Sequence, residues 1–297
     1  MTDQMTIFNR QSVRCHRDRA AATLLDHDFL FRETASRLVD RLNDVTRKFP
    51  RALDLGCHGG EIAESLHGIG GIGTLIQCDL SENMARRARH STAQLTLCAD
   101  EEALPFGDHV FDVVMSNLSL HWVNDLPGAL SQIRRSLNPD GLFVATLLGG
   151  ETLHELGHAM TTAEIEIESG LSPRLSPFAE VKDVGNLLTR AGFTLPVADR
   201  ETITVSYPSA FKLMSDLRGM GETNATLLRR TEFSRRATLM RAAEIYNETF
   251  ADDNGRIPAT FEVLYLTAWA PDQSQPKPLK PGSAQTRMAD AFGIPDT

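Results

Sequence analysis

The sequence has few cysteines, and they are widely spaced. Of its 297 residues only 4 are cysteine, and Cys15, Cys57, Cys78 and Cys98 form no C-x-x-C pair. This spacing excludes a disulfide-stapled framework and a zinc ribbon. It indicates a reducing compartment, the cytoplasm or a matrix-like equivalent, and we expect a cytoplasmic protein.

Long apolar runs and a basic field are also absent. No stretch approaches about 18 consecutive apolar residues, so we expect no transmembrane segment. The N-terminus shows no apolar region typical of a secretory signal. Acidic residues outnumber basic ones by 39 to 30, and the excess lies within residues 51–206. We therefore expect no nucleic-acid partner.

The composition is that of an ordinary globular protein, with 41% hydrophobic and 23% charged residues. The length alone favours about two domains, but the patterning predicts additions to a single one. Residues 1–50 are expected to form an N-terminal helical arm. One α/β domain is expected over 51–270, with a helical cap inserted at 207–260 and a flexible tail at 271–297.

Basic residues gather at the start of the arm, where Arg10, Arg14, Arg17 and Arg19 follow one another at short intervals. We interpret them as a solvated helix face. The alternative is contact with an acidic partner or a lipid surface.

From residue 51 onward, strand patterns alternate with helix patterns. Apolar strands are expected at 52–55, 74–78, 95–99, 110–116 and 142–148, and two late strands at 202–205 and 263–268. Strands that alternate with helices predict a doubly wound, mostly parallel sheet. Ligands of such sheets bind beyond the carboxyl ends of the strands, where the strand order reverses.

Unusual residues stand at those strand ends. The first strand runs into Asp54-Leu55-Gly56-Cys57-His58-Gly59-Gly60, a turn whose glycines expose backbone N–H groups to a ligand. Asp79 ends the second strand, at a distance where an acidic group accepts hydrogen bonds from ribose hydroxyls. Asp100, with Glu101 beside it, ends the third strand and is placed to read an adenine amino group. The sequence therefore predicts a nucleoside-containing ligand at this edge.

On this turn, Asp79, Asp100 and the Leu104-Pro105-Phe106 turn, the sequence resembles class I (type 11) S-adenosylmethionine-dependent methyltransferases. The resemblance implies a seven-stranded Rossmann-like sheet and S-adenosyl-L-methionine as the cofactor. It places Gly56, Cys57 and Gly60 against the methionine portion, Asp79 on the ribose and Asp100 near the adenine. Asp54, Glu101 and Asn117 complete the predicted cofactor site. The sequence departs from the family at His58, where a glycine is usual.

Further motifs narrow the substrate. The run Leu120-His121-Trp122-Val123-Asn124-Asp125 resembles both malonyl-acyl-carrier-protein O-methyltransferases of biotin synthesis and the related complex I assembly factors, which include arginine hydroxylases. Residues 149–156, 176–178 and 216–224 resemble the assembly factors. The resemblance implies a protein substrate, a subunit of NADH–quinone oxidoreductase, with peripheral contact to the inner membrane left open. A small-molecule or acyl-carrier O-methyltransferase and a non-catalytic assembly chaperone remain as alternatives.

Two residues are candidates for catalysis. His121 follows the fourth strand and could position or deprotonate a substrate, while Tyr207 follows the sixth strand. Packing at the sheet edge is the alternative role for both. His154-Glu155-Leu156-Gly157-His158 fits the zinc signature H-E-x-x-H, but it lacks the further ligands of the longer signatures. We therefore expect no metal site.

Overall fold

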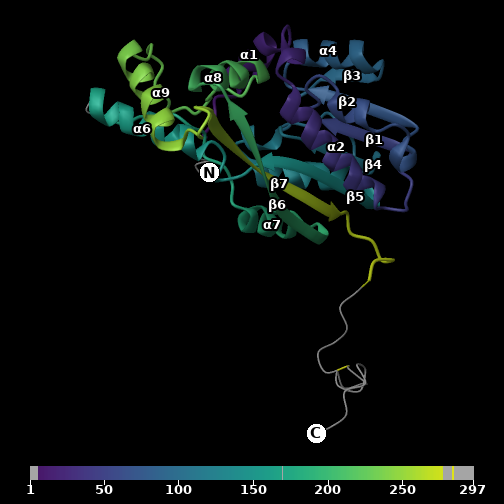
Figure 1. The fold of residues 1–297 in the computed structure, drawn as a ribbon. Coiled ribbons are helices and arrows are strands. Elements are labelled where there is room, and N and C mark those ends of the chain that lie inside the picture. The colour runs from purple at the N-terminus through teal and green to yellow at the C-terminus, as the bar shows by residue number, and fades with distance from the viewer. Residues whose placement is uncertain (1–5, 169, 277–282, 284–297) are drawn as a thin grey trace.

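The computed structural model describes residues 6–168, 170–276 and 283, and it shows one seven-stranded sheet flanked by helices (Figure 1). The strands are β1 Arg51–Leu55, β2 Thr74–Asp79, β3 Leu95–Cys98, β4 Phe111–Asn117, β5 Leu137–Leu148, β6 Thr194–Tyr207 and β7 Ile257–Trp269. Their order is β3-β2-β1-β4-β5-β7-β6. β1 to β5 are parallel, and β7 is antiparallel to both β5 and β6. The predicted doubly wound, mostly parallel sheet is thereby confirmed.

Helices cover both faces of this sheet. They are α1 Arg10–Ala20, α2 Phe29–Asn43, α3 Glu61–Ser65, α4 Glu82–Thr92, α5 Leu126–Ser136, α6 His154–Glu168, α7 Val181–Arg190, α8 Ala210–Met220 and α9 Arg236–Phe250. On β4, Val113 and Met115 pack with α2, whereas Val114 between them packs with α5 and α7. Because successive side chains of a strand point to opposite faces, a strand covered on both faces is apolar throughout, as β4 was expected to be.

The strand order reverses at β1, which lies between β2 and β4. The carboxyl ends of β1, β2 and β4 therefore meet at one edge of the sheet, and the turn after β1 lies at the switch point. The helix α1 lies across this edge, between α4 and α8 (Figure 1).

Helices α6, α8 and α9, which we call the cap helices, pack beyond the same end of the sheet (Figure 1). Their apolar residues join side chains from α2 and β7 in one core cluster, which includes Leu30, Met160, Leu213, Ile245 and Phe261. The predicted tail at 271–297 lies for the most part outside the described residues. Among the residues that the structure does describe, none belongs to a helix long and apolar enough to cross a membrane.

Two element boundaries differ from the sequence expectation. β6 runs from Thr194 to Tyr207, well beyond the expected 202–205, because an edge strand is half exposed and so carries no continuous apolar run. β5 begins at Leu137, before the turn expected at 138–141. A register shift opposite β4 and a positive φ of 59° at Asp140 absorb that turn within the strand.

Candidate active site

The turn after β1 bends as its glycines predict. Gly56 has φ 73° and Gly60 has φ 101°, both in the left-handed region that glycine adopts at little cost. A Cβ atom on Gly56 would lie 2.0 Å from Ser119 Oγ. The turn therefore requires glycine at position 56 for its backbone conformation and for the close approach of the segment after β4.

His58 replaces a glycine of the family pattern without breaking the turn. It has φ 46°, and its ring stacks on Phe31 with 4.2 Å between ring centroids. Its Nε2 atom lies 3.1 Å from the carbonyl oxygen of Asn117 and 3.2 Å from that of Leu118, so Nε2 must carry the proton and donate. Burial lowers the pKa of His58, with Arg17 nearby adding to the effect. The neutral ring thus ties the turn to the end of β4.

Acidic side chains from two neighbouring strand ends converge beside this turn. Asp79, at the end of β2, accepts hydrogen bonds from the backbone N–H of Ser81 at 2.8 Å and of His58 at 3.2 Å. Asp100 and Glu101 follow β3, and Glu101 accepts a hydrogen bond of 2.6 Å from Ser119 Oγ. The structure therefore brings together Gly56, Asp79, Asp100 and Glu101 as the sequence predicts.

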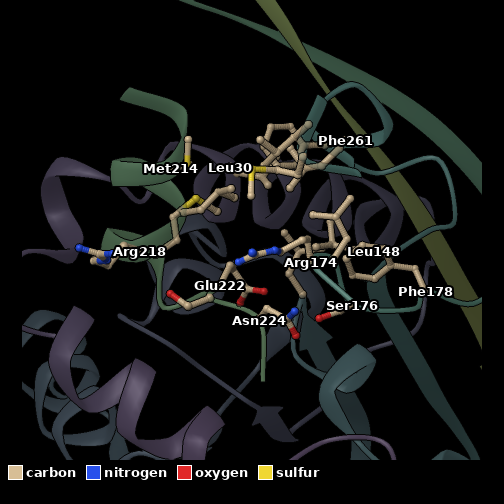
Figure 2. A pocket seen from close by; sticks show the side chains of 18 of the residues that line it. Leu30, Leu148, Arg174, Ser176, Phe178, Met214, Arg218, Glu222, Asn224 and Phe261 are labelled. Carbon is tan, nitrogen blue, oxygen red and sulfur yellow. The ribbon is translucent and has the colours of Figure 1, made fainter. Parts of the chain in front are cut away.

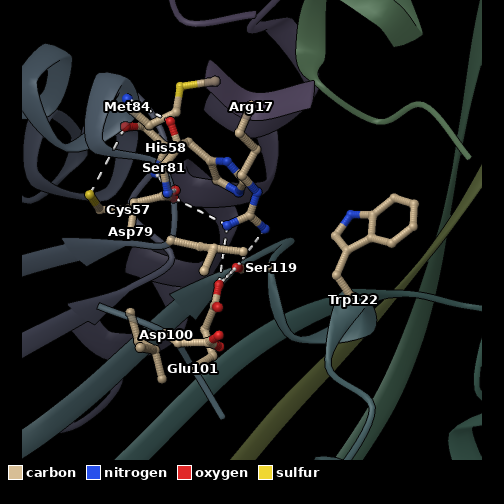
Figure 3. Close-up of polar contacts among 12 residues, drawn as sticks. Arg17, Cys57, His58, Asp79, Ser81, Met84, Asp100, Glu101, Ser119 and Trp122 are labelled. Atoms are coloured by element: carbon tan, nitrogen blue, oxygen red, sulfur yellow. Dashed lines mark hydrogen bonds and ion pairs between the residues drawn. The ribbon is translucent and has the colours of Figure 1, made fainter. Parts of the chain in front are cut away.

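Two arginines of the N-terminal arm, Arg10 and Arg17, pair with these acids, and Figure 3 shows the contacts of Arg17. The Arg17 guanidinium lies 3.3 Å from Asp79 Oδ2, 3.1 Å from Glu101 Oε1 and 2.8 Å from Ser119 Oγ. Arg10 donates to Asp100 at 2.6 Å and also to Glu101. The interpretation of these two residues as a solvated helix face is wrong, since the Arg17 side chain is 1% exposed and the Arg10 side chain 13%. Arg14 and Arg19 of the same helix are exposed.

Charge pairing dominates the electrostatics of this cluster. Burial alone would raise the pKa of Glu101, but Arg17 and Arg10 lower it to about 2. Burial opposes the charge on Arg17 as well, yet Asp79 and Glu101 raise the pKa of its guanidinium. A charge buried inside a protein is usually paired with a charge of opposite sign. Here Arg17 is paired with both Asp79 and Glu101.

The other predicted cofactor residues lie around the turn and make different contacts. Asp54 accepts a hydrogen bond from Gln77 at 3.2 Å, and burial raises its pKa to about 7. Cys57 is buried, which raises the pKa of its thiol. Asn117 donates to the carbonyl oxygen of Phe31 at 2.9 Å and accepts from Thr146 at 2.8 Å, which links β4 to α2 and β5.

His121 shares a buried glutamate with the next residue. Glu222, two residues after the end of α8, accepts hydrogen bonds at its Oε2 from His121 Nε2 at 3.1 Å and from Trp122 Nε1 at 2.9 Å. The His121 ring also contacts Phe178, with 6.0 Å between centroids. His121 is thus positioned by Glu222 and by aromatic neighbours.

Tyr207 ends β6 and lies in the core cluster beneath the cap helices. Burial, together with the nearby Asp216 carboxylate, raises the pKa of its phenol. A phenol with a raised pKa holds its proton more firmly, so the position does not favour Tyr207 as a base.

A cavity of about 310 Å³ opens between the sheet edge and the cap helices (Figure 2). This volume is at the lower end of the roughly 300–1,000 Å³ typical of ligand sites. Its walls are mostly apolar and include Phe31, Leu118, Trp122, Met160, Phe178 and Met214. Glu222 lies in the wall beside the segment after β4, where its Oε2 atom accepts the hydrogen bonds from His121 and Trp122.

The H-E-x-x-H segment lies at the start of α6, where His154 Nδ1 is 3.6 Å from Glu155 Oε2. His154 and His158 are exposed, whereas Glu155 is buried and accepts hydrogen bonds from the backbone and side chain of Thr260. Within the described part of the chain, no group of three or more His, Cys, Asp or Glu residues is arranged to hold a metal ion.

The sequence patterns do not predict Arg10, Arg17, Ser119 or Glu222 as site residues. One signal pointed to the two arginines. They stand seven residues apart, which is two turns of a helix, so they share one face. That face meets an acidic edge of opposite charge. Glu222 stands inside the segment 216–224, which resembles the assembly factors, but nothing in the sequence assigns it a contact.

Comparison with known proteins agrees with this geometry. Residues 53–145 match a family described as methyltransferase domain. The chain is 44% identical to arginine-hydroxylase NDUFAF5, mitochondrial, of Danio rerio, over 98% of this chain and 91% of that protein. It is 43% identical to the Homo sapiens protein of the same name, over 96% and 83%. A malonyl-[acyl-carrier protein] O-methyltransferase of Halorhodospira halophila is 36% identical, over 88% of each chain.

Solved structures share the fold at low sequence identity. The YcgJ protein of Bacillus subtilis has a TM-score of 0.57 at 14% identity and covers 81% of this chain and 99% of its own. Phosphoethanolamine N-methyltransferase 2 of Haemonchus contortus, in complex with S-adenosyl-L-methionine, has a TM-score of 0.54 at 17% identity, over 88% of this chain and 60% of that one.

These relatives correct one expectation and establish the family. The predicted cytoplasmic location is wrong, because the names of the NDUFAF5 relatives place them in mitochondria. The resemblance to methyltransferases and to the assembly-factor group is confirmed. With this identity over nearly its whole length, the chain belongs to the arginine-hydroxylase NDUFAF5 family, enzymes built on the S-adenosylmethionine-dependent methyltransferase fold.

Proposed function

We propose that this chain binds S-adenosyl-L-methionine at the edge formed by Gly56, Asp79, Asp100 and Glu101. From there it modifies an arginine side chain of a protein substrate, a subunit of NADH–quinone oxidoreductase. The observation that carries the proposal is the convergence of the three acids on a left-handed glycine turn at the switch point. In this proposal the arm 1–50 and the cap 207–260 are additions to one domain at 51–270, and the protein partner meets both.

The residues present suit this cofactor. Ser119 occupies the space that a Cβ on Gly56 would fill. The N–H groups of Gly56 and Cys57 both donate to the carbonyl oxygen of Cys78, so they hold the turn against β2 and, contrary to the sequence prediction, are not exposed to a ligand. Asp79 would accept hydrogen bonds from the ribose hydroxyls and Asp100 from the adenine amino group. When bound, the cofactor would supply a sulfonium-activated methyl group. The chain would mainly position the substrate against it.

Binding of the cofactor requires the Arg17 side chain to move away from Asp79. Arg17 and Ser119 lie over the turn, and Arg17 contacts the carboxylate proposed to hold the ribose. The Arg17–Asp79 contact, at 3.3 Å, is the longest of the three that Arg17 makes. The cofactor would replace Arg17 at Asp79, while Glu101 and Ser119 can continue to hold the guanidinium.

The part of the cavity at Glu222 favours a cationic substrate over an acidic one. Two arginines also line the cavity: Arg174, which pairs with Glu164, and Arg218. A malonyl group on an acyl carrier would bring a second carboxylate beside Glu222, and like charges in a buried site repel strongly. An arginine side chain would bring the opposite charge. The cavity therefore supports the arginine-modifying function better than the acyl-carrier alternative.

Isothermal titration with S-adenosyl-L-methionine tests the cofactor site. We expect the wild-type chain to bind, and Asp79→Asn to weaken binding by at least about tenfold, because a carboxylate accepts hydrogen bonds from hydroxyls more strongly than an amide does. Asp253→Asn is the matched control, since Asp253 is exposed and far from the edge in sequence. No binding by the wild-type chain, or equal binding by Asp79→Asn, would refute the proposed site.

A further inference from the structure

Only one of the two carboxylate oxygens of Glu222 is hydrogen-bonded to its described neighbours. Its side chain is 5% exposed. Oε2 accepts both hydrogen bonds, from His121 and from Trp122. Oε1 is buried and has no hydrogen-bond partner among the residues that the structure describes. A buried acceptor of this kind costs free energy unless a ligand or water satisfies it.

Glu222 keeps its charge in this position. Burial alone would raise its pKa, but His121 and then Arg17 lower it. His121 donates to Oε2, and Arg17 is committed to Asp79, Glu101 and Ser119. Neither residue contacts Oε1, so this oxygen has no direct partner among the described residues.

The cavity beside Glu222 suits the stem of a long side chain. Its lining includes Leu118, Met160, Phe178 and Met214, which offer apolar surface to methylene groups (Figure 2). The indole of Trp122 lies in the same wall, and aromatic faces attract guanidinium groups.

Two arginines line the cavity, Arg174 and Arg218, and the described structure shows no hydrogen bond or ion pair from either of them to Glu222. Arg174 donates to Glu164 through two of its nitrogens and to Ser234 at 2.7 Å through the third. All three nitrogens are thus engaged by α6 and by the segment before α9. Glu222 remains available to a cation that enters from outside.

We propose that Glu222 is the specificity-determining residue of this cavity, which receives the guanidinium of a substrate arginine at Oε1 and the arginine methylenes along its apolar wall. The choice of arginine rests on the proposed function, whereas the choice of a cation rests on the geometry. Glu222 is bonded to His121 and Trp122, which closely follow Ser119, the partner of Arg17 and Glu101. The bound side chain would therefore be adjacent to the proposed cofactor site.

Tryptophan fluorescence can test this directly. The chain has 2 tryptophans, Trp122 and Trp269, so a Trp269→Phe background leaves Trp122 as the sole indole reporter. The probes are three capped tripeptides with arginine, citrulline or lysine at the centre. Citrulline keeps the shape of arginine and removes its charge. We expect a saturable change with the arginine peptide and at least about tenfold weaker binding of the citrulline and lysine peptides.

The matched variants are Glu222→Gln and Glu232→Gln. Glutamine still accepts from His121 and Trp122, so Glu222→Gln should fold with a similar melting temperature and lose arginine-peptide binding by at least about tenfold. Glu232, whose side chain is 83% exposed, should behave as wild type. If Glu222→Gln fails to fold, the comparison of peptides on the unsubstituted site still decides the question.

Several results would overturn the inference. These are equal binding of arginine and citrulline peptides, equal binding of arginine and lysine peptides, no fluorescence change at millimolar arginine peptide, or unchanged binding by a folded Glu222→Gln variant. Failure of the proposed cofactor site is distinguishable from these outcomes. It would appear as absent binding of S-adenosyl-L-methionine by a chain that still discriminates among the peptides.

Discussion

At the scale of single residues, arginines of the same chain neutralise the negative charges at the edge of the sheet. Asp79 and Glu101 come from strand ends, and Arg17 reaches them from a helix more than sixty residues earlier. Removing one member of a buried ion pair leaves the other charge uncompensated, which usually costs more than the pair itself contributes. The arginine is therefore expected to matter for stability as well as for cofactor access.

Substitution of Arg17 tests this balance. We expect Arg17→Met to lower the free energy of unfolding by about 3–5 kcal/mol near neutral pH. Arg14→Met is the control, because Arg14 lies on the same helix with its side chain 49% exposed and makes only a 3.8 Å pair with Asp18. Urea unfolding of both variants measures the difference, and equal losses would contradict the account.

The same variant should change the pH dependence of stability. In the wild type, Arg17 and Arg10 hold the pKa of Glu101 at about 2, below its ordinary 4.5. A lowered carboxyl pKa contributes stability that is fully present above about pH 4.5 and is lost as pH falls toward about 2. The gap between wild type and Arg17→Met should therefore narrow as pH falls through that window.

Residue identities at strand ends could be predicted from the sequence, but their partners could not. Asp79 and Asp100 follow from the spacing of strands and the rule that ligands bind at the carboxyl ends. The burial of Arg17 and the pairing of only one oxygen of Glu222 depend on contacts between residues far apart in the sequence. Local patterns contain no information on such contacts.

At the scale of elements, the N-terminal segment is fastened at two points before α1 begins. Asn124 accepts hydrogen bonds at its Oδ1 from the backbone N–H groups of Ile7 and Phe8, at 2.8 and 2.7 Å. Asn9 donates its backbone N–H to Ala225 and caps α1 by accepting from Ser12. These contacts set the position of α1, and with it the position of Arg10 and Arg17 over the acidic edge.

Removal of the hydrogen bonds to Asn124 should make residues 7–10 more mobile. We expect Asn124→Ala to accelerate amide hydrogen exchange at residues 7–10 by about tenfold or more, because two hydrogen bonds of about 1 kcal/mol each are removed. Asn247→Ala, at an exposed position of α9, is the control. Unchanged exchange at residues 7–10 in Asn124→Ala would show that α1 is held in place without Asn124.

The sequence predicted the strands of the sheet and the helices between them more accurately than it predicted the structure of the N-terminal arm. β1, β2, β4 and the core of β5 are buried apolar segments bounded by turn residues, which is the pattern that local reasoning detects best. The arm appeared to be one amphipathic helical region with an exposed basic start. Its division into α1 and α2, and its packing over the sheet edge, are set by tertiary contacts.

At the scale of the whole molecule, the charge distribution has a structural explanation. The chain has a formal net charge of −9, with the acidic excess at residues 51–206. Part of that excess lies at the sheet edge, where Arg10 and Arg17 of the mildly basic arm neutralise it. Arg37 and Arg41 of α2 likewise pair with Asp199 and Glu201 of β6. The opposite charges of arm and domain thus hold the two together.

The cavity between the cap helices and the sheet could not be derived from the sequence. A helical cap was expected at 207–260, and α8 and α9 lie in that range. The pairing of α6 with α9 and the enclosed space between these helices and β4 depend on how separate amphipathic faces meet. The substrate cavity is therefore a property of the assembled fold.

Mass spectrometry tests whether this chain modifies an arginine of a respiratory-complex subunit. NADH–quinone oxidoreductase subunits would be digested and compared from cells that contain the chain and cells that lack it. We predict an arginine-bearing peptide that carries one extra oxygen atom or one extra methylene unit only when the chain is present. Identical peptide masses in both kinds of cell would contradict the account and favour a non-catalytic assembly role.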